Sequence, residues 1–205
     1  MNLKIGVLSL QGAFKEHIIK LKECGTDATE IKFPGQLKYI DGLIIPGGES
    51  TTIKKLLEKY SFKDELDKFY KQGKPILGTC AGLVLMAKNI KEEGKGFGYI
   101  DINVKRNAYG RQVDSFEEFI EIDFSQNEKE LNENKRKIKF KSIFIRAPKI
   151  INTGKNIKIM ASLNNEAVLV RNHSVIACTF HPELTDDLSI HQYFKNMIKN
   201  YKGEN

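Results

Sequence analysis

The fold is decided by one apolar stretch, residues 75–86, which reads Pro-Ile-Leu-Gly-Thr-Cys-Ala-Gly-Leu-Val-Leu-Met. This pattern predicts a short buried strand that runs through a glycine-flanked cysteine directly into an apolar helix. In the segment Gly78-x-Cys80-x-Gly82, two residues without Cβ allow strand and helix to meet at a sharp, strained turn, whose central side chain projects from the carboxyl edge of a sheet. A thiol at a helix N-terminus is also favoured as the thiolate. Cys80 is therefore a candidate nucleophile, and a buried structural cysteine is the alternative.

Strands and helices alternate on the N-terminal side of this stretch. Residues 4–10 form an apolar run typical of a buried strand, and residues 13–23 are amphipathic with helical spacing. Further strands are expected at 28–33 and 39–45, and further helices at 53–58 and 62–72. This alternation predicts an α/β fold in which a mostly parallel central sheet is covered by helices on both faces.

The C-terminal half has a different pattern, with shorter segments of strand type. The expected strands are residues 100–104, 116–124, 138–145, 157–161, 167–171 and 175–180. Short antiparallel hairpins are expected here, because Asn164-Asn165 and Asn172-His173 are good turn dipeptides. The charged residues 125–137 are interpreted as a surface loop, with a short exposed helix as the alternative, and residues 188–201 as a closing amphipathic helix.

Length and composition restrict the class of protein. The 205 residues suffice for one full core, so we expect a single domain over residues 1–205. No apolar run approaches the length of about 18 residues that a membrane helix needs. The first residues also lack the features of a signal peptide. We therefore expect a cytoplasmic protein that does not interact with a membrane.

Cysteine content and charge argue against other classes. The cysteines Cys24, Cys80 and Cys178 are widely spread and have no zinc-like spacing with the histidines, so neither a disulfide framework nor a metal site is expected. The net charge of +7 raises the question of nucleic acid. Because the lysines are scattered among acidic residues without a basic stripe, we expect a solvated surface and no nucleic-acid partner.

A nucleophilic cysteine needs a base, and His181 is the best candidate among the histidines. It follows the last predicted strand and precedes Pro182, which favours extended geometry at His181. Residues two apart in an extended run point the same way, so Glu183 can orient the imidazole. Cys80, His181 and Glu183 therefore form a candidate nucleophilic triad. An ordinary turn at the end of a strand is the alternative for the His-Pro-Glu segment.

Acyl transfer also requires hydrogen-bond donors for a tetrahedral oxyanion. The strand at 39–45 ends on Pro46-Gly47-Gly48-Glu49-Ser50-Thr51-Thr52, where the main-chain N–H groups of the glycine pair are unshielded. The N–H of Ala81, directly after the nucleophile, is the natural second donor. We expect Gly48 and Ala81 to form this site at the carboxyl edge of the sheet. A tight turn is the alternative for the glycine pair.

Several segments, taken together, carry a family resemblance. They are Gly78-Thr79-Cys80-Ala81-Gly82, Pro46-Gly47-Gly48-Glu49-Ser50-Thr51-Thr52, Phe180-His181-Pro182-Glu183-Leu184, Val7-Leu8-Ser9-Leu10-Gln11-Gly12-Ala13, Arg106-Asn107-x-Tyr109-Gly110-Arg111-Gln112-x-Asp114-Ser115-Phe116 and Ile145-Arg146-Ala147-Pro148. They resemble class I, triad-type glutamine amidotransferases, and more narrowly the glutaminase subunits of pyridoxal 5′-phosphate synthase. The resemblance runs nearly end to end and implies a three-layer, flavodoxin-like fold. The charged segment at 125–137 is longer than the connection expected in the family.

The resemblance implies roles for the candidate triad. Cys80 attacks the side-chain amide of L-glutamine, His181 acts as base and then protonates the departing ammonia, and Glu183 holds His181. Water then hydrolyses the thioester to glutamate. Guanidinium groups suit the substrate carboxylate, although a surface ion pair is the alternative for each arginine. The residues that the resemblance implies for glutamine binding are Gly48, Glu49, Ser50, Arg106, Ile145 and Arg146.

The resemblance also implies a partner. The family's ammonia passes to a separate (β/α)₈ synthase subunit that builds pyridoxal 5′-phosphate, and this chain contains no barrel. We therefore expect one half of a hetero-oligomer, without a cofactor of its own. Gln11, Gly12 and His17 match the region that family members place against the synthase. An ordinary exposed helix residue is the alternative for His17.

Two other functions remain open at this point. One is the glutaminase subunit of another amidotransferase, for example that of histidine biosynthesis, although the segments at 106–116 and 145–148 argue against it. The other is a non-catalytic redox sensor in which Cys80 is the sensor thiol. Such a sensor has no need of His181 and Glu183 beside an oxyanion site.

Overall fold

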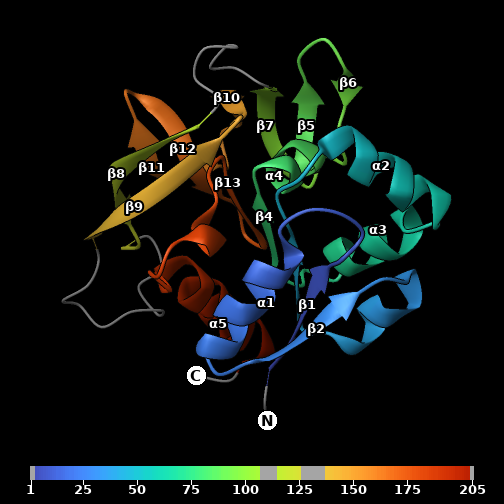
Figure 1. The fold of residues 1–205 in the computed structure, drawn as a ribbon. Coiled ribbons are helices and arrows are strands. Elements are labelled where there is room, and N and C mark those ends of the chain that lie inside the picture. Colours follow the sequence, from blue (N-terminus) through green and yellow to red (C-terminus); the bar gives the residue numbers. More distant parts are fainter. Residues whose placement is uncertain (1–2, 107–114, 126–136, 204–205) are drawn as a thin grey trace.

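The computed structural model describes residues 3–106, 115–125 and 137–203, and its centre is a seven-stranded sheet (Figure 1). The strand order is β11-β12-β13-β4-β3-β1-β2. The parallel strands are β1 (Lys4–Leu8), β2 (Asp27–Ile31), β3 (Gly42–Ile45), β4 (Ile76–Thr79) and β13 (Val175–Cys178). One edge is completed by two antiparallel strands, β12 (Glu166–Arg171) and β11 (Lys158–Leu163).

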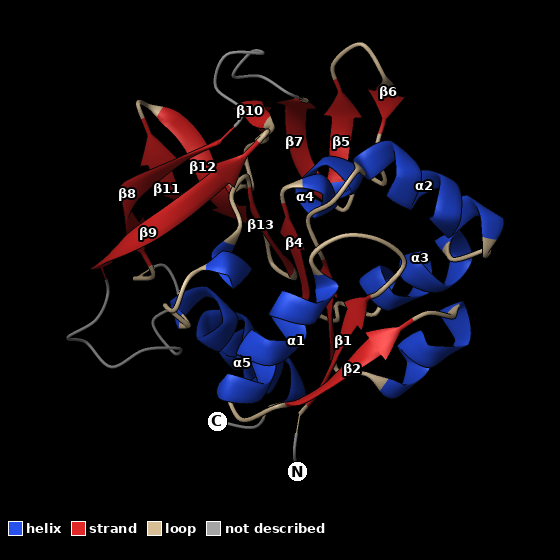
Figure 2. Ribbon diagram, viewed as in Figure 1, coloured by secondary structure: helices blue, strands red, loops and turns tan. Residues whose placement is uncertain are grey.

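Helices cover both faces of this sheet (Figure 2). One face packs against α2 (Ser50–Lys59), α3 (Lys63–Lys71) and the short α4 (Ala81–Met86). The other packs against α1 (Phe14–Glu23) and α5 (Ser189–Lys202). The predicted α/β fold, with a mostly parallel sheet between two helical layers, is confirmed.

The central strands divide their side chains between two apolar cores, because successive side chains of a strand point in opposite directions. In β13, Val175 and Ala177 belong to the core shared with α2, α3 and α4, whereas Ile176 and Cys178 belong to the core shared with α1 and α5. A strand buried on both faces is apolar at every position, which explains the continuous apolar runs in the sequence. The carboxyl ends of β3, β4 and β13 are thereby fixed side by side at one edge of the sheet.

Two smaller sheets flank the central one. The four-stranded sheet has the order β10-β7-β5-β6 and consists of β5 (Ala87–Ile90), β6 (Gly94–Lys95), β7 (Ile100–Lys105) and β10 (Lys149–Thr153). The second is an antiparallel ribbon of β8 (Ser115–Asp123) and β9 (Lys137–Ile145). The expected short strands and hairpins of the C-terminal half are confirmed, whereas β5, β6 and β10 were not predicted.

The structure differs from the prediction before β3. A strand was expected over residues 39–45, but β3 begins only at Gly42, and Pro34–Tyr39 forms the 3₁₀ helix η1. The side chain of Gln36 stabilises the N-terminal end of this helix, because its Oε1 accepts the N–H groups of Lys32 and Phe33 at 2.7 and 2.8 Å. Tyr39 consequently lies on the surface, with 67% of its area exposed.

The two asparagine turns are built in different ways. Asn164 and Asn165 both have left-handed backbones, with φ of 50° and 64°, as predicted. Asn172 instead uses its side chain, whose Oδ1 accepts the N–H groups of Ser174 and Val175 at 3.0 and 2.7 Å. Most of the charged segment interpreted as a loop, residues 126–136, lies outside the described residues.

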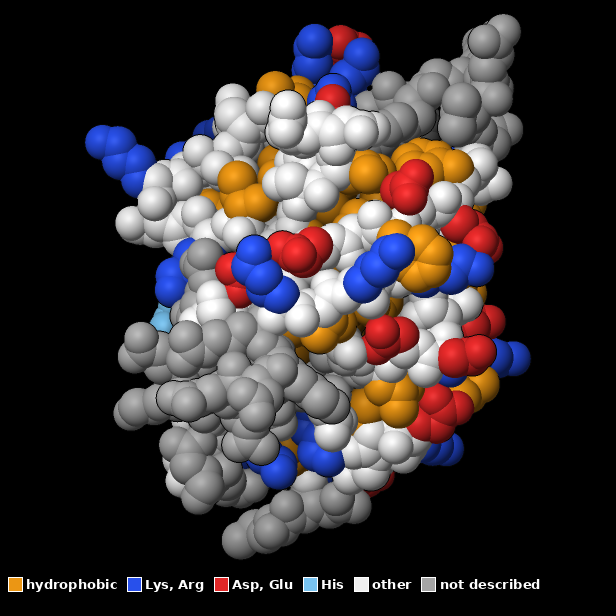
Figure 3. All heavy atoms as spheres, turned by 90° about the vertical axis from the view of Figure 1, so that its left-hand side faces the viewer, with side chains coloured by type: hydrophobic (Ala, Val, Ile, Leu, Met, Phe, Trp, Pro, Cys, Tyr) orange, Lys and Arg blue, Asp and Glu red, His pale blue; other side chains and the backbone are white. Residues whose placement is uncertain are grey.

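The face that carries the β8–β9 ribbon mixes acidic and basic side chains (Figure 3). Across the ribbon, Lys141 pairs with Glu117 at 2.6 Å and Lys137 with Glu121 at 2.8 Å. Two of the three lysines in β9 are thus compensated locally, and the third, Lys139, lies over the ring of Phe119. This mixture of charges agrees with the expected solvated surface. None of the helices in the described ranges combines the length and the apolar character needed to span a membrane.

Candidate active site

Cys80 forms the elbow between β4 and α4. Its backbone has φ 47° and ψ −101°, a conformation that residues with a Cβ rarely adopt. The N–H of Cys80 still donates to the carbonyl of Cys178 in β13 at 2.9 Å, so sheet bonding continues up to the turn itself. The predicted strained turn at the carboxyl edge of the sheet is confirmed.

Close packing explains a glycine beside this elbow. A Cβ at Gly82 would lie 1.9 Å from the carbonyl oxygen of Ile45, which is the last residue of β3. No side chain fits there, because real Cβ atoms do not approach an oxygen so closely. The first turn of α4 therefore rests directly on the end of β3, and Ala81 is held at the same edge as Cys80.

His181 follows β13 and reaches the same edge. Its Nδ1 lies 2.7 Å from Oε1 of Glu183, and its side chain lines the same cavity as Cys80. His181 and Glu183 are only 7% and 2% exposed. The geometry that joins them differs from the prediction, because Pro182–Leu184 form the 3₁₀ turn η3 rather than an extended run. The 3₁₀ turn η3, and not an extended backbone, therefore brings the side chain of Glu183 to the imidazole of His181.

Hydrogen bonding controls the protonation of His181. Burial acts to lower its pKa, but hydrogen bonding and electrostatic interaction with Cys80 and Glu183 raise the pKa of His181 to about 10. A protonated imidazole beside a thiol favours the thiolate, which is the nucleophilic form. A protonated His181 can also act as the general acid that protonates a leaving group.

The loop between β3 and α2, residues 46–49, is named the oxyanion loop here after its predicted role, and it lies against the candidate triad. A Cβ at Gly47 would lie 2.4 Å from Cε1 of His181 and 3.4 Å from Cβ of Cys80. Because the imidazole is buried and bonded to Glu183, it has no room to move away from such a side chain. The first glycine of the predicted oxyanion loop is therefore needed for its small size.

The peptide groups of this loop are partly engaged. The N–H of Gly47 donates to Oγ1 of Thr79 at 3.0 Å, and its carbonyl accepts the N–H of Ala13 at 3.0 Å. The N–H of Gly47 is thus engaged by Thr79 rather than directed at a substrate. The two residues expected to supply oxyanion donors, Gly48 and Ala81, both line the cavity beside the thiol.

A cavity of about 230 Å³ opens over Cys80. It brings together the expected nucleophile and base with all the residues expected to bind glutamine. Those residues are Gly48, Glu49, Ser50, Arg106, Ile145 and Arg146. Glu183 does not line the cavity and lies behind His181. Within the described ranges, no three His, Cys, Asp or Glu side chains are grouped so that they could hold a metal ion.

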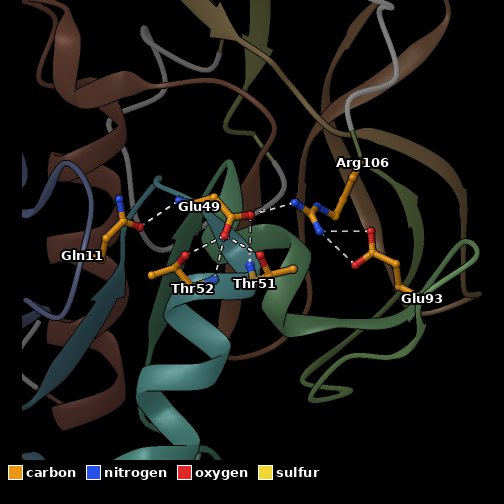
Figure 4. A network of polar contacts seen from close by, with 6 residues as sticks. All are labelled: Gln11, Glu49, Thr51, Thr52, Glu93 and Arg106. Atoms are coloured by element: carbon orange, nitrogen blue, oxygen red, sulfur yellow. Dashed lines mark hydrogen bonds and ion pairs between the residues drawn. The ribbon is translucent and has the colours of Figure 1, made fainter.

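Arg106 is held at the cavity by two carboxylates (Figure 4). Its Nη2 lies 2.8 Å from Oε1 of Glu49, and its Nη1 lies 3.1 Å from both oxygens of Glu93. Glu93 comes from the turn between β5 and β6, so the arginine connects this hairpin to the oxyanion loop. The ion pair that the sequence left open is present, and it keeps the guanidinium at the cavity.

Glu49 also caps helix α2. Its carboxylate accepts the N–H groups of Thr51 and Thr52 at 3.2 and 2.7 Å and is bonded to both of their hydroxyls. The side-chain bond from Thr51, reinforced by the other bonds from both threonines, outweighs burial and lowers the pKa of Glu49 to about 2. Its own N–H donates to Oε1 of Gln11 at 2.8 Å. The oxyanion loop is therefore held by helix α2 through the side chain of Glu49 and by Gln11 through its N–H.

Arg146 enters the cavity from the end of β9. Its backbone is left-handed, with φ 43°, and the residue is exposed. Among the described residues it has no ion-pair partner, unlike Arg106. The carbonyl of the preceding Ile145 lies 3.9 Å from Sγ of Cys80. Arg146 therefore brings to the cavity a positive charge that no described residue compensates.

The residues expected to face a partner behave differently from one another. Gln11 and Gly12 are partly exposed and lie against the oxyanion loop. His17, however, is fully buried, because it shares the inward face of α1 with Leu21. Its side chain cannot reach a surface partner, so the predicted interface role is corrected. His17 instead lies 3.3 Å from Glu183.

The sequence analysis missed three polar residues that support the site, namely Thr79 and His191 behind it and Glu93 beside Arg106. A signal for Thr79 was present, since it is a hydroxyl residue at the end of an otherwise apolar strand. His191 sits between Ile190 and Tyr193 on a helix whose inward residues are mostly apolar, so its burial could have been suspected. Nothing in the local pattern distinguishes Glu93 from other surface glutamates, because its pairing depends on a distant arginine.

Comparison with solved structures defines the class. A structure described as the crystal structure of a glutamine amidotransferase is 41% identical, with a TM-score of 0.84, and the match covers 95% of this chain and 98% of that one. The structure of PurLQS from Thermotoga maritima shares the fold at 15% identity, with a TM-score of 0.72 over 98% of this chain and 100% of that one. The fold is that of the glutamine amidotransferases.

Sequence comparison then defines the family. The SNO glutamine amidotransferase family matches residues 7–200, and the chain belongs to this family. The pyridoxal 5′-phosphate synthase subunit PdxT of Thermotoga petrophila is 46% identical over 198 residues, 96% of this chain and 100% of that protein. The protein of the same name from Shouchella clausii is 48% identical over 197 residues, 96% of this chain and 95% of that protein. The family resemblance inferred from the motifs is confirmed.

Proposed function

We propose that this chain is the glutaminase subunit of a pyridoxal 5′-phosphate synthase. It hydrolyses L-glutamine to L-glutamate and ammonia, and the ammonia passes to a separate synthase subunit. Relatives of nearly the same length carry the name of such a subunit. The observation that carries the chemistry is the hydrogen bond between buried His181 and Glu183, at a cavity that His181 lines together with Cys80.

The first half-reaction forms a thioester. The thiolate of Cys80 attacks the amide carbon of the glutamine side chain, and the carbonyl electrons move to the oxygen. The N–H groups of Gly48 and Ala81 donate to this oxyanion. His181 gives the proton it took from the thiol to the amide nitrogen, the C–N bond breaks, and ammonia leaves. Glu183 remains ionised throughout and holds the imidazole in place.

The second half-reaction restores the enzyme. His181, now neutral, takes a proton from water while the water oxygen attacks the thioester carbon. When the C–S bond breaks, the sulfur leaves as the thiolate beside the imidazolium, and glutamate is released. Each turnover thus consumes one water and one glutamine and returns Cys80 and His181 to their starting state.

Charge distribution assigns different binding roles to the two arginines. The charge of Arg106 is already neutralised by Glu49 and Glu93. Its guanidinium is therefore assigned to orienting the substrate through hydrogen bonds of fixed geometry, and not to attracting it by net charge. Arg146 is uncompensated among the described residues and supplies the net attraction for the α-carboxylate of glutamine. Glu49, Ser50 and Ile145 line the same cavity, which supports assigning the rest of the substrate to them.

The partner is proposed to be a (β/α)₈ synthase subunit in a hetero-oligomer. Gln11 and Gly12 are the residues we assign to this contact, because they are partly exposed and touch the oxyanion loop. A partner that presses on them can therefore affect the site directly. We propose that the complex functions in the cytoplasm.

The decisive experiment measures glutamate release from glutamine with and without the synthase subunit. We expect release to rise sharply on addition of the synthase, and to be abolished by Cys80→Ala. A glutamine-derived electrophile should label Cys80. Undiminished turnover by Cys80→Ala would refute the mechanism. Activation only by a cyclase of histidine biosynthesis would establish the second function considered above. A reactive thiol without turnover, even with the synthase present, would favour a redox sensor.

A further inference from the structure

Two fully buried histidines lie behind the triad, and the proposed mechanism uses neither. His17 is on α1 and His191 on α5, two helices that lie side by side over the same face of the sheet (Figure 1). Both side chains are 0% exposed. Imidazoles are costly to bury without hydrogen bonds, so their contacts require an explanation.

His17 faces the side of Glu183 that His181 does not use. Its Nε2 lies 3.3 Å from Oε2 of Glu183 and 3.2 Å from Oγ1 of Thr79. Oε2 is buried and makes no regular hydrogen bond to any described residue, so the Nε2 atom of His17 is the polar group facing it. An N–H that is shared between two acceptors is poorly aligned with each, which explains the length of both contacts.

The direction of the hydrogen bonds follows from the chemistry of the partners. The pKa of Glu183 is lowered although burial opposes this, because the facing His17 and the bond from His181 favour the charged form. A carboxylate can only accept, so Nε2 of His17 must carry the hydrogen. Burial lowers the pKa of His17, and the ring is therefore neutral with a bare Nδ1.

His191 completes this assignment. Its Nε2 lies 2.9 Å from Nδ1 of His17 and must donate to it. Burial holds the pKa of His191 well below its ordinary value, so this ring is neutral too. Its own Nδ1 is then a bare acceptor, which agrees with the lack of any hydrogen-bond partner for that atom among the described residues. One tautomer of each histidine satisfies all the contacts.

We propose that His17 is a positioning residue for the reaction: its Nε2–H holds Oε2 of Glu183, and His191 fixes the tautomer that makes this possible. Through Thr79, whose hydroxyl accepts the N–H of Gly47 at 3.0 Å, the same imidazole also touches the residue that anchors the oxyanion loop. The imidazole of His17 therefore contacts both Glu183, which orients His181, and Thr79, which anchors Gly47 in the oxyanion loop.

The alternative is a histidine pair that only fills the core. Two variants of similar size separate these possibilities, because His17→Gln retains an N–H donor and His17→Leu does not. The test rests on the proposed glutaminase activity and is made with the complete complex of this chain and its synthase. The number of competent sites is first counted by labelling Cys80 with a glutamine-derived electrophile, so that kcat refers to folded chains only.

We expect His17→Leu to lower kcat per labelled site by about 10- to 100-fold, the range seen when a reacting group is misplaced. KM should change by less than about threefold, because His17 does not line the cavity. His17→Gln should recover most of the loss. Equal kcat in both variants, whether near the wild-type value or equally reduced, would overturn the proposal. Absence of glutamate release by the wild-type complex would instead refute the proposed function.

A second measurement does not depend on a stable variant. In the ¹⁵N spectrum of the wild-type chain near neutral pH, His17 should be protonated at Nε2 and bare at Nδ1, and His191 likewise. The opposite tautomer at His17, or a doubly protonated ring, would overturn the assignment. This readout also stays informative if His17→Leu fails to fold.

Discussion

Nδ1 of His181 lies 2.7 Å from Oε1 of Glu183, and both side chains are buried beside Cys80. Because Glu183 occupies Nδ1, the other ring nitrogen is the one left for the thiol. In the proposed mechanism, the carboxylate thus decides both where the imidazole points and which nitrogen exchanges protons with Cys80.

Replacement of Glu183 by Gln should remove this control. The amide has the same shape but can present an N–H to Nδ1, which reverses the tautomer, and we expect kcat for glutamine hydrolysis to fall by about 10²- to 10⁴-fold. Glu117→Gln, on the distant β8–β9 ribbon, is a matched control that should retain full activity. A Glu183→Gln chain that folds and turns over glutamine at the wild-type rate would contradict the assigned role.

The raised pKa of His181 predicts a dependence of stability on pH. Its value of about 10 in the folded chain exceeds the ordinary value of 6.5, so folding binds a proton between these limits. The stabilising contribution is complete below about pH 6.5 and is lost as the pH rises toward 10. Thermal unfolding of the wild type and of His181→Asn should therefore give a difference in Tm that shrinks as the pH rises through this window. A difference that grows or stays constant would show that the imidazole is not held protonated.

The pairing of Glu93 with Arg106 predicts an effect on substrate binding. Glu93→Gln should leave Arg106 less well ordered and raise KM for glutamine by about two- to fivefold, because exposed ion pairs contribute up to about 1 kcal/mol. We expect kcat to change little, since Glu93 does not touch the reacting atoms. The adjacent exposed Glu92 makes the matched control, Glu92→Gln. Steady-state kinetics that give the same KM for both variants would show that the ion pair has no role in binding.

The contact of Gly47 with the imidazole predicts a severe effect of one methyl group. Gly47→Ala places a Cβ 2.4 Å from Cε1 of His181, so either the loop or the histidine must shift. We expect glutamine hydrolysis to fall by about 100-fold, as for other small displacements of reacting groups. Gly35→Ala is the control, because a Cβ there meets nothing within 4 Å. Full activity of Gly47→Ala would mean that the loop does not lie against His181 in the working enzyme.

Much of the site could be predicted because its elements have strong local patterns. The apolar strand before Cys80 and the glycines around it require a sharp turn, and the parallel sheet brings the ends of β3, β4 and β13 together. The His-Pro-Glu segment was placed correctly at this edge, although η3 joins the two side chains by a different geometry.

Other features depend on contacts that no local pattern contains. The burial of His17 follows from the packing of α5 over α1, and the pairing of Arg106 with Glu93 joins residues 13 positions apart through the turn after β5. A clue to His17 was available, because it lies three residues after Phe14 and four before Leu21, which belong to the apolar face of α1. The strand expected at residue 39 failed because the side chain of Gln36 stabilises η1 instead.

At Cys80, a positive φ makes the residue that is best for stability different from the residue that is needed for the proposed activity. Glycine would occupy φ 47° without steric cost, whereas a residue with a Cβ in such a region costs about 1 to 3 kcal/mol. A chain selected only for thermal robustness would therefore drift away from cysteine here. That this energetically unfavourable side chain is present at the elbow marks it as one retained for its chemistry and not for its packing.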